Sequence, residues 1–188
     1  MSIRFALPLA LALSTFVNLA HAGNSEPAHS PRAPGAVSAE HARLARLAGL
    51  WNVKQSLWLK HGEPPQTDLE MAEFIAVLGG RALRQDLRIS SSTPFQGIGF
   101  TGYDNITRTY YTSWMDVNFT DLLVLRGIRD ERTNTWRFSG SMSGVDGTPT
   151  PTRQELKILD EDHFVVRYFE TKGGSETLAV KLEYSRHW

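Results

Sequence analysis

Apolar and polar residues alternate with a period of two along most of the chain from Trp51 onward. In the first such segment Trp51 and Val53 alternate with Asn52 and Lys54, a pattern typical of a β-strand with one buried face. Turn-forming Gly, Pro, Asn and Asp residues recur at intervals of about ten positions, as in a series of hairpins. The pattern predicts strands near residues 51–59, 67–77, 81–89, 96–103, 109–116, 120–129, 135–142, 152–159, 163–171 and 176–185.

One helical segment precedes these strands. Ser38 is a good N-cap, Leu44 and Leu47 follow at helical spacing, and Gly49 is placed to end the helix. The fold class that we expect is therefore all-β, with one short N-terminal helix.

A sheet of about ten strands joined by short hairpins tends to curl, and closure removes both of its exposed edges. We therefore predict an antiparallel up-and-down, lipocalin-like barrel, with a two-sheet sandwich as the alternative. Barrels of this strand number can enclose a cavity for a small ligand. Alternation predicts that these side chains face inward: Leu83, Leu87 and Ile89; Leu122, Val124 and Ile128; Trp136, Phe138 and Met142; Leu178, Val180, Leu182 and Tyr184.

The first 22 residues have the layout of a secretory signal peptide. Arg4 is followed by an apolar run and by Ala20-His21-Ala22, a small-x-small cleavage site. Residues 23–37 are rich in Pro, Ser and Ala and predict a disordered linker, and the barrel domain is expected over residues 38–188. We therefore expect an exported protein, periplasmic or secreted, without a stable membrane anchor.

The composition excludes several classes of function. The formal net charge is zero, which gives no electrostatic attraction for nucleic acid. The absence of Cys excludes disulfides, thiolate nucleophiles and thiolate metal sites. The His residues have no spacing typical of a metal site, so we expect no metal and no cofactor, and nothing in the pattern specifies an oligomeric state.

Several residues are candidates for the lining of a ligand pocket in the lumen. Tyr110, Trp114 and Asp116 share one face of the strand predicted over 109–116. If that face points inward, an acid and two aromatic rings line one mouth of the barrel. If it points outward, Asp116 is a solvated residue of a strand end.

A second candidate carboxylate is Glu73, which lies between Met71 and Ile75 on an apparently apolar face. A buried acid needs a partner, and Arg84 and Arg126 are the two candidates for it. A β-bulge that shifts the face is the alternative. Trp51, the first inward residue of the first strand, completes the predicted lining.

Gly97 and Gly99 lie two positions apart and hence on one face of a strand. These glycines do not indicate a phosphate-binding loop, because such a loop precedes a helix and the residues that follow here predict a strand. We expect the two glycines to permit a bend or close contact with a bulky neighbour such as Trp51 or Trp114.

Three motifs carry a resemblance to a known family. They are Gly49-Leu50-Trp51, Leu78-Gly79-Gly80-Arg81, and the stretch from Phe95 to Asn105 with the Tyr110-Tyr111 and Trp114-Met115-Asp116 that follow it. Over residues 40 to 186 the chain resembles the family catalogued as domain of unknown function 1579. The resemblance implies a calycin-like β-barrel and no established activity, cofactor or catalytic residue.

The strand number and the opening Gly-x-Trp also resemble, more distantly, the nitrobindin-type haem barrels. Those barrels hold haem iron through a His near the C-terminal strands, and the segment 176–185 contains no His. We therefore do not expect haem.

The leading functional hypothesis is a non-enzymatic exported barrel that binds a small apolar or amphipathic molecule in its lumen. One alternative is an enzyme that uses a luminal carboxylate, Asp116 or Glu73, for acid–base chemistry. Another is an interaction module that uses the outer face of the barrel, with Trp58 as an exposed anchor.

Overall fold

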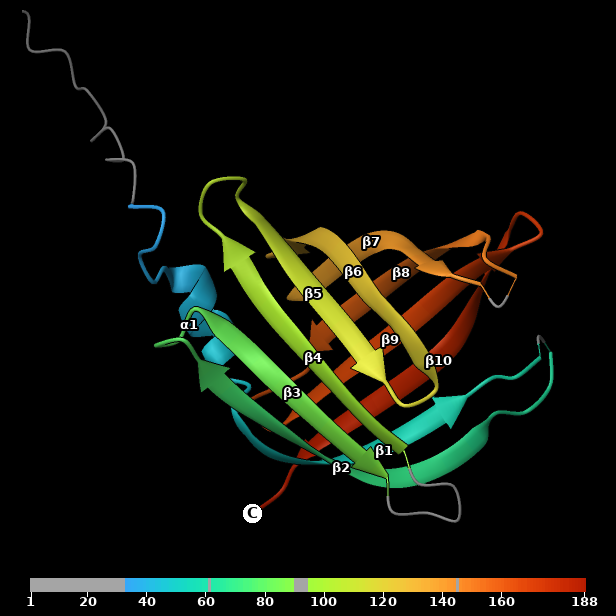
Figure 1. The fold of residues 1–188 in the computed structure, drawn as a ribbon. Coiled ribbons are helices and arrows are strands. Elements are labelled where there is room, and N and C mark those ends of the chain that lie inside the picture. The colour runs from blue at the N-terminus through green and yellow to red at the C-terminus, as the bar shows by residue number, and fades with distance from the viewer. Residues whose placement is uncertain (1–32, 61, 90–94, 145) are drawn as a thin grey trace, which may run out of the picture. The chain divides into compact units, whose positions relative to one another are not determined.

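The computed structural model describes residues 33–60, 62–89, 95–144 and 146–188, and shows one helix followed by ten strands (Figure 1). The predicted signal segment and most of the predicted linker lie outside the described residues. The helix is α1 (Ala39–Ala45), and the strands are β1 (Gly49–Leu57), β2 (Gln66–Val77), β3 (Ala82–Ile89), β4 (Phe95–Asp104), β5 (Thr109–Asp116), β6 (Phe119–Asp130), β7 (Thr135–Ser143), β8 (Pro149–Ile158), β9 (His163–Lys172) and β10 (Ser175–Arg186).

The strands form one closed antiparallel barrel in which each strand pairs with its neighbours in sequence. Pairing of β1 with β10, from Trp51 opposite Arg186 to Leu57 opposite Val180, closes the circle. The predicted ten-stranded up-and-down barrel with one short helix is confirmed, and the sandwich alternative is wrong. No helix in the described part of the chain has the length and apolar character needed to span a membrane.

Most of the predicted inward positions are buried. Leu83, Leu87, Trp136, Phe138, Leu182 and Tyr184 are all at most 5% exposed, and Val180 packs against the same core. Met142 and Leu178 are half-buried, and a register shift between Leu178 and Val180 interrupts the alternation in β10. Nothing is described of the Ile89 side chain.

The prediction for β6 is wrong. Leu122, Val124 and Ile128 are exposed, whereas Leu125 is fully buried and Leu123 packs against the core. The reason is that residues 122–125 are all apolar, so both faces of this strand carry hydrophobic side chains and alternation alone does not identify the inner one.

Outward apolar residues also occur on β4 and β5. Ile98 pairs with Met115, and Phe100 pairs with Ser113, which in turn pairs with Val124.

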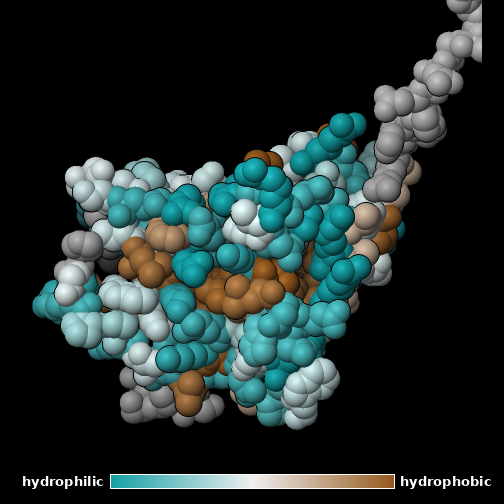
Figure 2. Space-filling view, turned by 180° about the vertical axis from the view of Figure 1, so that it is seen from behind, coloured by the Kyte–Doolittle hydropathy of each residue, from teal (hydrophilic) through white to brown (hydrophobic). Residues whose placement is uncertain are grey.

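Figure 2 shows the molecule from behind relative to Figure 1. The surface on this side is mostly hydrophilic, with an apolar strip across its middle.

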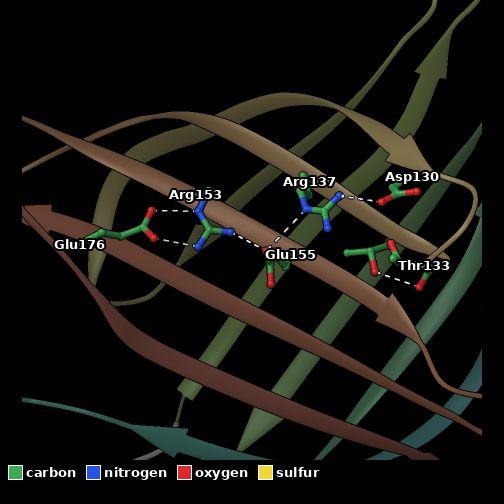
Figure 3. Close-up of polar contacts among 7 residues, drawn as sticks. Asp130, Thr133, Arg137, Arg153, Glu155 and Glu176 are labelled. Atoms are coloured by element: carbon green, nitrogen blue, oxygen red, sulfur yellow. Dashed lines mark hydrogen bonds and ion pairs between the residues drawn. The ribbon is translucent and has the colours of Figure 1, made fainter.

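Ion pairs cover part of the outer surface of β7, β8 and β10 (Figure 3). Arg153 donates to both carboxylate oxygens of Glu176 over 2.8 Å and to Glu155 over 2.6 Å. Arg137 extends the network from Glu155, at 3.7 Å, to Asp130, at 3.3 Å. The Arg153 guanidinium also lies over the Phe169 ring at 3.9 Å, so polar contacts on this face shield an aromatic side chain.

Helix α1 begins at the predicted N-cap. The backbone N–H of Ser38 donates to Nδ1 of His41 over 3.1 Å, and the Ser38 hydroxyl lies 2.8 Å from the same nitrogen. His41 is buried and its ring meets the edge of Tyr103 in β4. This cap therefore also attaches the helix to the barrel.

The helix packs at one end of the barrel (Figure 1). Leu44 and Leu47 are buried in the same core as the barrel residues. The indole N–H of Trp51 donates to the Leu47 carbonyl over 2.9 Å, and the Tyr110 hydroxyl donates to the Glu40 carboxylate. These contacts close the end of the barrel at which β1 begins.

The two glycines of β4 accommodate Trp114. A Cβ atom on Gly97 would lie 2.1 Å from Cζ2 of Trp114, and one on Gly99 would lie 2.8 Å from Cε3 of the same ring. The indole therefore rests directly on the β4 backbone, as the predicted close contact requires, and Trp114 rather than Trp51 is the neighbour.

We predict that Gly97→Ala destabilises the protein by about 1–3 kcal/mol, the usual cost of overpacking, because the new methyl group overlaps the indole ring. Urea denaturation measures the change in the free energy of unfolding. Gly35→Ala is the control, since a Cβ atom there meets nothing within 4 Å. Equal stability of the two variants would contradict the packing of Trp114 on β4.

Candidate functional site

The lumen has a closed half next to α1, filled with aromatic rings. Trp51 meets Phe164 edge-on at 4.7 Å between ring centroids, Phe164 stacks on Tyr184 at 4.1 Å, and Tyr110 meets Trp136 at 5.8 Å. Each of these rings is at most 3% exposed. This half is part of the hydrophobic core and has no room for a ligand.

The middle of the lumen is nearly filled and contains several polar side chains among apolar ones. The Gln85 side-chain amide donates to the Tyr184 hydroxyl over 3.0 Å, and the hydroxyl of Thr101 donates to that of Thr112 over 3.3 Å. The cavity at this level has a volume of about 10 Å³, and its lining includes Gln85, Thr112 and Gln154. That volume is the size of one water molecule, so a larger ligand does not fit at this level.

The other half of the lumen, at the end opposite α1, is not covered by any helix of the described residues. Its inward-facing hydrophobic residues pack against the core and yet are only half-buried. We call this region the open half; its hydrophobic lining consists of Phe95, Trp114, Leu123, Tyr168 and Val180. Trp114 and Tyr168 also line the small cavity of the middle layer, so the open half begins directly at that layer. Accessible aromatic and aliphatic side chains are typical of the lining of a small-molecule site.

Asp116 lies at the rim of the open half and is held by local contacts. Its Oδ2 accepts a hydrogen bond from the Trp114 indole N–H over 2.8 Å, and its Oδ1 accepts one from the backbone N–H of Asn118 over the same distance. The carboxylate therefore orients the indole ring and also caps the turn that follows β5.

Glu70, an inward residue of β2, is the buried acid of the lumen. It is 6% exposed, and neither carboxylate oxygen has a hydrogen-bond partner among the described residues. It lies opposite Val53 in the β1–β2 ladder, with Asp68 two residues nearer the open end. Desolvation, and after it the charge of Asp68, raises the pKa of Glu70 from 4.5 to about 7.

Two predicted site residues face outward. Glu73 is exposed and pairs in register with Asp86, whose carboxylate accepts a hydrogen bond from Arg84 over 2.9 Å on the outer face. The prediction that Glu73 and Arg84 line the lumen is therefore wrong. The cause is a misassigned face: the apolar residues Met71 and Ile75 flank Glu73 but point outward.

Trp51 and Tyr110 face the lumen, as predicted, but in its closed half. Of the predicted residues, the structure brings only Trp114 and Asp116 together in the open half. Sequence reasoning missed Glu70. The pairing of the first two strands could have revealed it. Glu70 lies on the same face of β2 as Ala72 and Phe74, and it pairs with Val53, which is on the same face of β1 as Trp51.

A larger hollow, of about 890 Å³, has a lining drawn mainly from outward-facing residues of β1, β2, β9 and β10. It includes apolar Leu69 and Met71, basic Lys54 and Arg88, and acidic Glu70 and Glu183. This wide, mixed surface points to no particular ligand. Within the described ranges no group of three or more His, Cys, Asp or Glu side chains is arranged to hold a metal ion.

The protein is a closed, ten-stranded antiparallel barrel. The profile of the family described as "Protein of unknown function (DUF1579)" matches residues 36–186. The chain belongs to this family, as the motifs around Phe95–Asn105 predicted.

No curated protein matches the chain. Among solved structures the chain is similar to a redesigned β-barrel, at 14% sequence identity and a TM-score of 0.42, over 79% of this chain and 96% of the other. The more distant likeness to nitrobindin-type barrels is not confirmed by these matches.

The raised pKa of Glu70 predicts how stability depends on pH. The protonated carboxyl is the form that the folded state favours, so the associated stability is fully present below pH 4.5 and is lost as the pH rises through about 7. Glu70→Gln should remove this dependence and raise the free energy of unfolding at pH about 8 by up to about 3 kcal/mol.

Urea denaturation at pH about 5 and about 8 measures this effect. Glu73→Gln, a change in an exposed acid three residues along the same strand, is the matched control and should keep the pH dependence of the unmodified protein. An unchanged pH dependence in Glu70→Gln would show that Glu70 is not the group that titrates.

Proposed function

We propose that the protein binds a small apolar or amphipathic molecule in the open half of the lumen. The observation that carries the proposal is the half-exposure of the inward-facing hydrophobic side chains Phe95, Trp114, Leu123, Tyr168 and Val180. Hydrophobic residues on the inner face of a closed barrel are normally covered by one another, as they are in the closed half. A bound molecule that covers them gains about 25 cal/mol per Å² of apolar surface removed from water.

The two levels below the open half limit the size of the ligand. The polar layer with Gln85 and Gln154 leaves room for one water, and the aromatic rings beyond it are fully packed. The ligand is therefore held at one end of the barrel, with part of it at the mouth, and an amphipathic molecule suits this position because its polar group stays near solvent.

We propose further that the protein acts outside the cytoplasm, in the periplasm or as a secreted protein. The proposal rests on the signal-peptide layout of residues 1–22. A cysteine-free domain that is held by a large closed core needs no disulfides for this environment.

A substitution that fills the open half should weaken ligand binding. Leu123→Trp replaces an aliphatic side chain in the lumen by a larger indole ring. We expect at least about tenfold weaker binding of Nile red, a neutral apolar dye, in a fluorescence titration. Leu122→Trp, one residue earlier and on the outer face, is the matched control and should bind as the unmodified protein does. Equal affinities of the two variants would place the dye outside the lumen.

The export proposal predicts the mass of the mature chain. Protein purified from the envelope of its own cells should begin at Gly23, which intact-mass spectrometry measures directly. Native mass spectrometry of the same sample should detect a small organic molecule that is lost on denaturation. A chain that retains residues 1–22 would contradict cleavage after Ala22.

A further inference from the structure

Three acidic side chains occupy inward positions of the open half. Asp68 and Glu70 lie on β2 and Asp116 on β5, all on the face that their strands turn toward the lumen. The basic side chains described on the neighbouring strands, Lys54, Arg88 and Lys181, lie on outward positions. These three carboxylates favour a cation over an anion.

Glu70 distinguishes this arrangement from a solvated acidic rim. A carboxylate that is 94% buried and has no hydrogen-bond partner in the described structure is costly, because it has lost water without gaining a donor. Natural proteins pair such groups with a cation or a donor. Here the inward residue beside it, Asp68, is a second acid, which increases the cost of ionising Glu70.

The inward side chains described next to Glu70 carry no positive charge, and the nearby Lys54 and Arg88 lie on outward positions. Val53 of β1 pairs with Glu70 on one side and with Tyr184 of β10 on the other, and Leu87 of β3 pairs with Ala72, the next inward residue of β2. The pKa of Tyr184 is raised by burial, by its neighbour Tyr168 and by Glu70, so this phenol stays neutral and its hydroxyl already contacts Gln85.

We infer that the ligand of the open half is a cationic amphiphile, whose protonated amine pairs with Asp68 and Glu70 while its hydrocarbon part covers Trp114, Leu123 and Val180. The inference rests on the proposed function and names the chemical class of its ligand. An ammonium group supplies up to three hydrogen-bond donors and one positive charge, the two properties that the two carboxylates lack. Asp68 is half-buried and nearer the open end, so the amine meets it first and Glu70 is the deeper partner.

The same arrangement excludes fatty acids. A carboxylate head group would add a like charge next to Asp68 and Glu70, at a cost that its hydrocarbon chain must offset. A neutral alcohol of equal chain length gains the hydrophobic contact and loses only the ion pair. The order of affinity expected is therefore amine, alcohol, acid.

The experiment compares dodecylamine, dodecanol and dodecanoate, each below its micelle concentration, by isothermal titration calorimetry on the full-length protein. At pH about 8 we expect dodecylamine to bind at least about tenfold more tightly than dodecanol, the ratio that about 1.4 kcal/mol of ion pairing gives. Its affinity should decrease toward pH about 5.5, as Glu70 becomes protonated, while the affinity of dodecanol stays constant.

Glu70→Gln and Asp68→Asn should each weaken dodecylamine binding and leave dodecanol binding unchanged. Glu73→Gln, on the outer face of the same strand, should change neither. Because dodecanol reports on the intact lumen, a variant that fails to fold loses both ligands and is recognised as such.

Two outcomes would overturn the inference, and they are distinguishable. Equal binding of amine and alcohol, with no effect of Glu70→Gln, would show that the open half binds apolar chains without selecting a cation, and the proposed function would stand. Binding of none of the three molecules would reject the luminal site itself, and the inference with it.

Discussion

The pairing of β1 with β10 is the contact on which the rest of the structure depends. It converts an open sheet into a barrel, removes two exposed edges and gives every strand one enclosed face. Arg186 reinforces this closure: its guanidinium lies over the Trp51 ring at 4.2 Å, donates to the Ala48 carbonyl and pairs with Asp162 at 3.3 Å. One residue of the last strand thus connects the start of the first strand with the turn before β9.

Closure also makes the two ends of the barrel unequal. At the end where β1 begins, the short helix contributes Leu44 and Leu47 and the lumen is filled with aromatic rings. At the other end the described residues form no helix, and Trp114 and its hydrophobic neighbours remain half-exposed. The asymmetry follows from the position of one helix of seven residues, which has enough side chains to cover one end of the barrel and not both.

A closed lumen is also what makes Glu70 unusual. The same residue on the outer face would be a solvated acid. Inside, it is removed from water, and Asp68 adds like charge. A protein that keeps such a group has either a protonated acid in its core or a positively charged partner for it, and the acidic lining of the open half favours the partner.

The sequence by itself determined the strands, their antiparallel order, the helix and its cap at Ser38, because alternation, turn residues and capping are local properties. It also predicted that Gly97 and Gly99 permit close contact with a bulky neighbour, Trp51 or Trp114, and the structure decided for Trp114. Only the tertiary structure decided which face points inward where both faces carry apolar residues. Leu122 and Glu73 were therefore assigned to the wrong face, and Glu70 was missed: the phase of each strand is set by pairing with its neighbours around the closed barrel, which no single segment encodes.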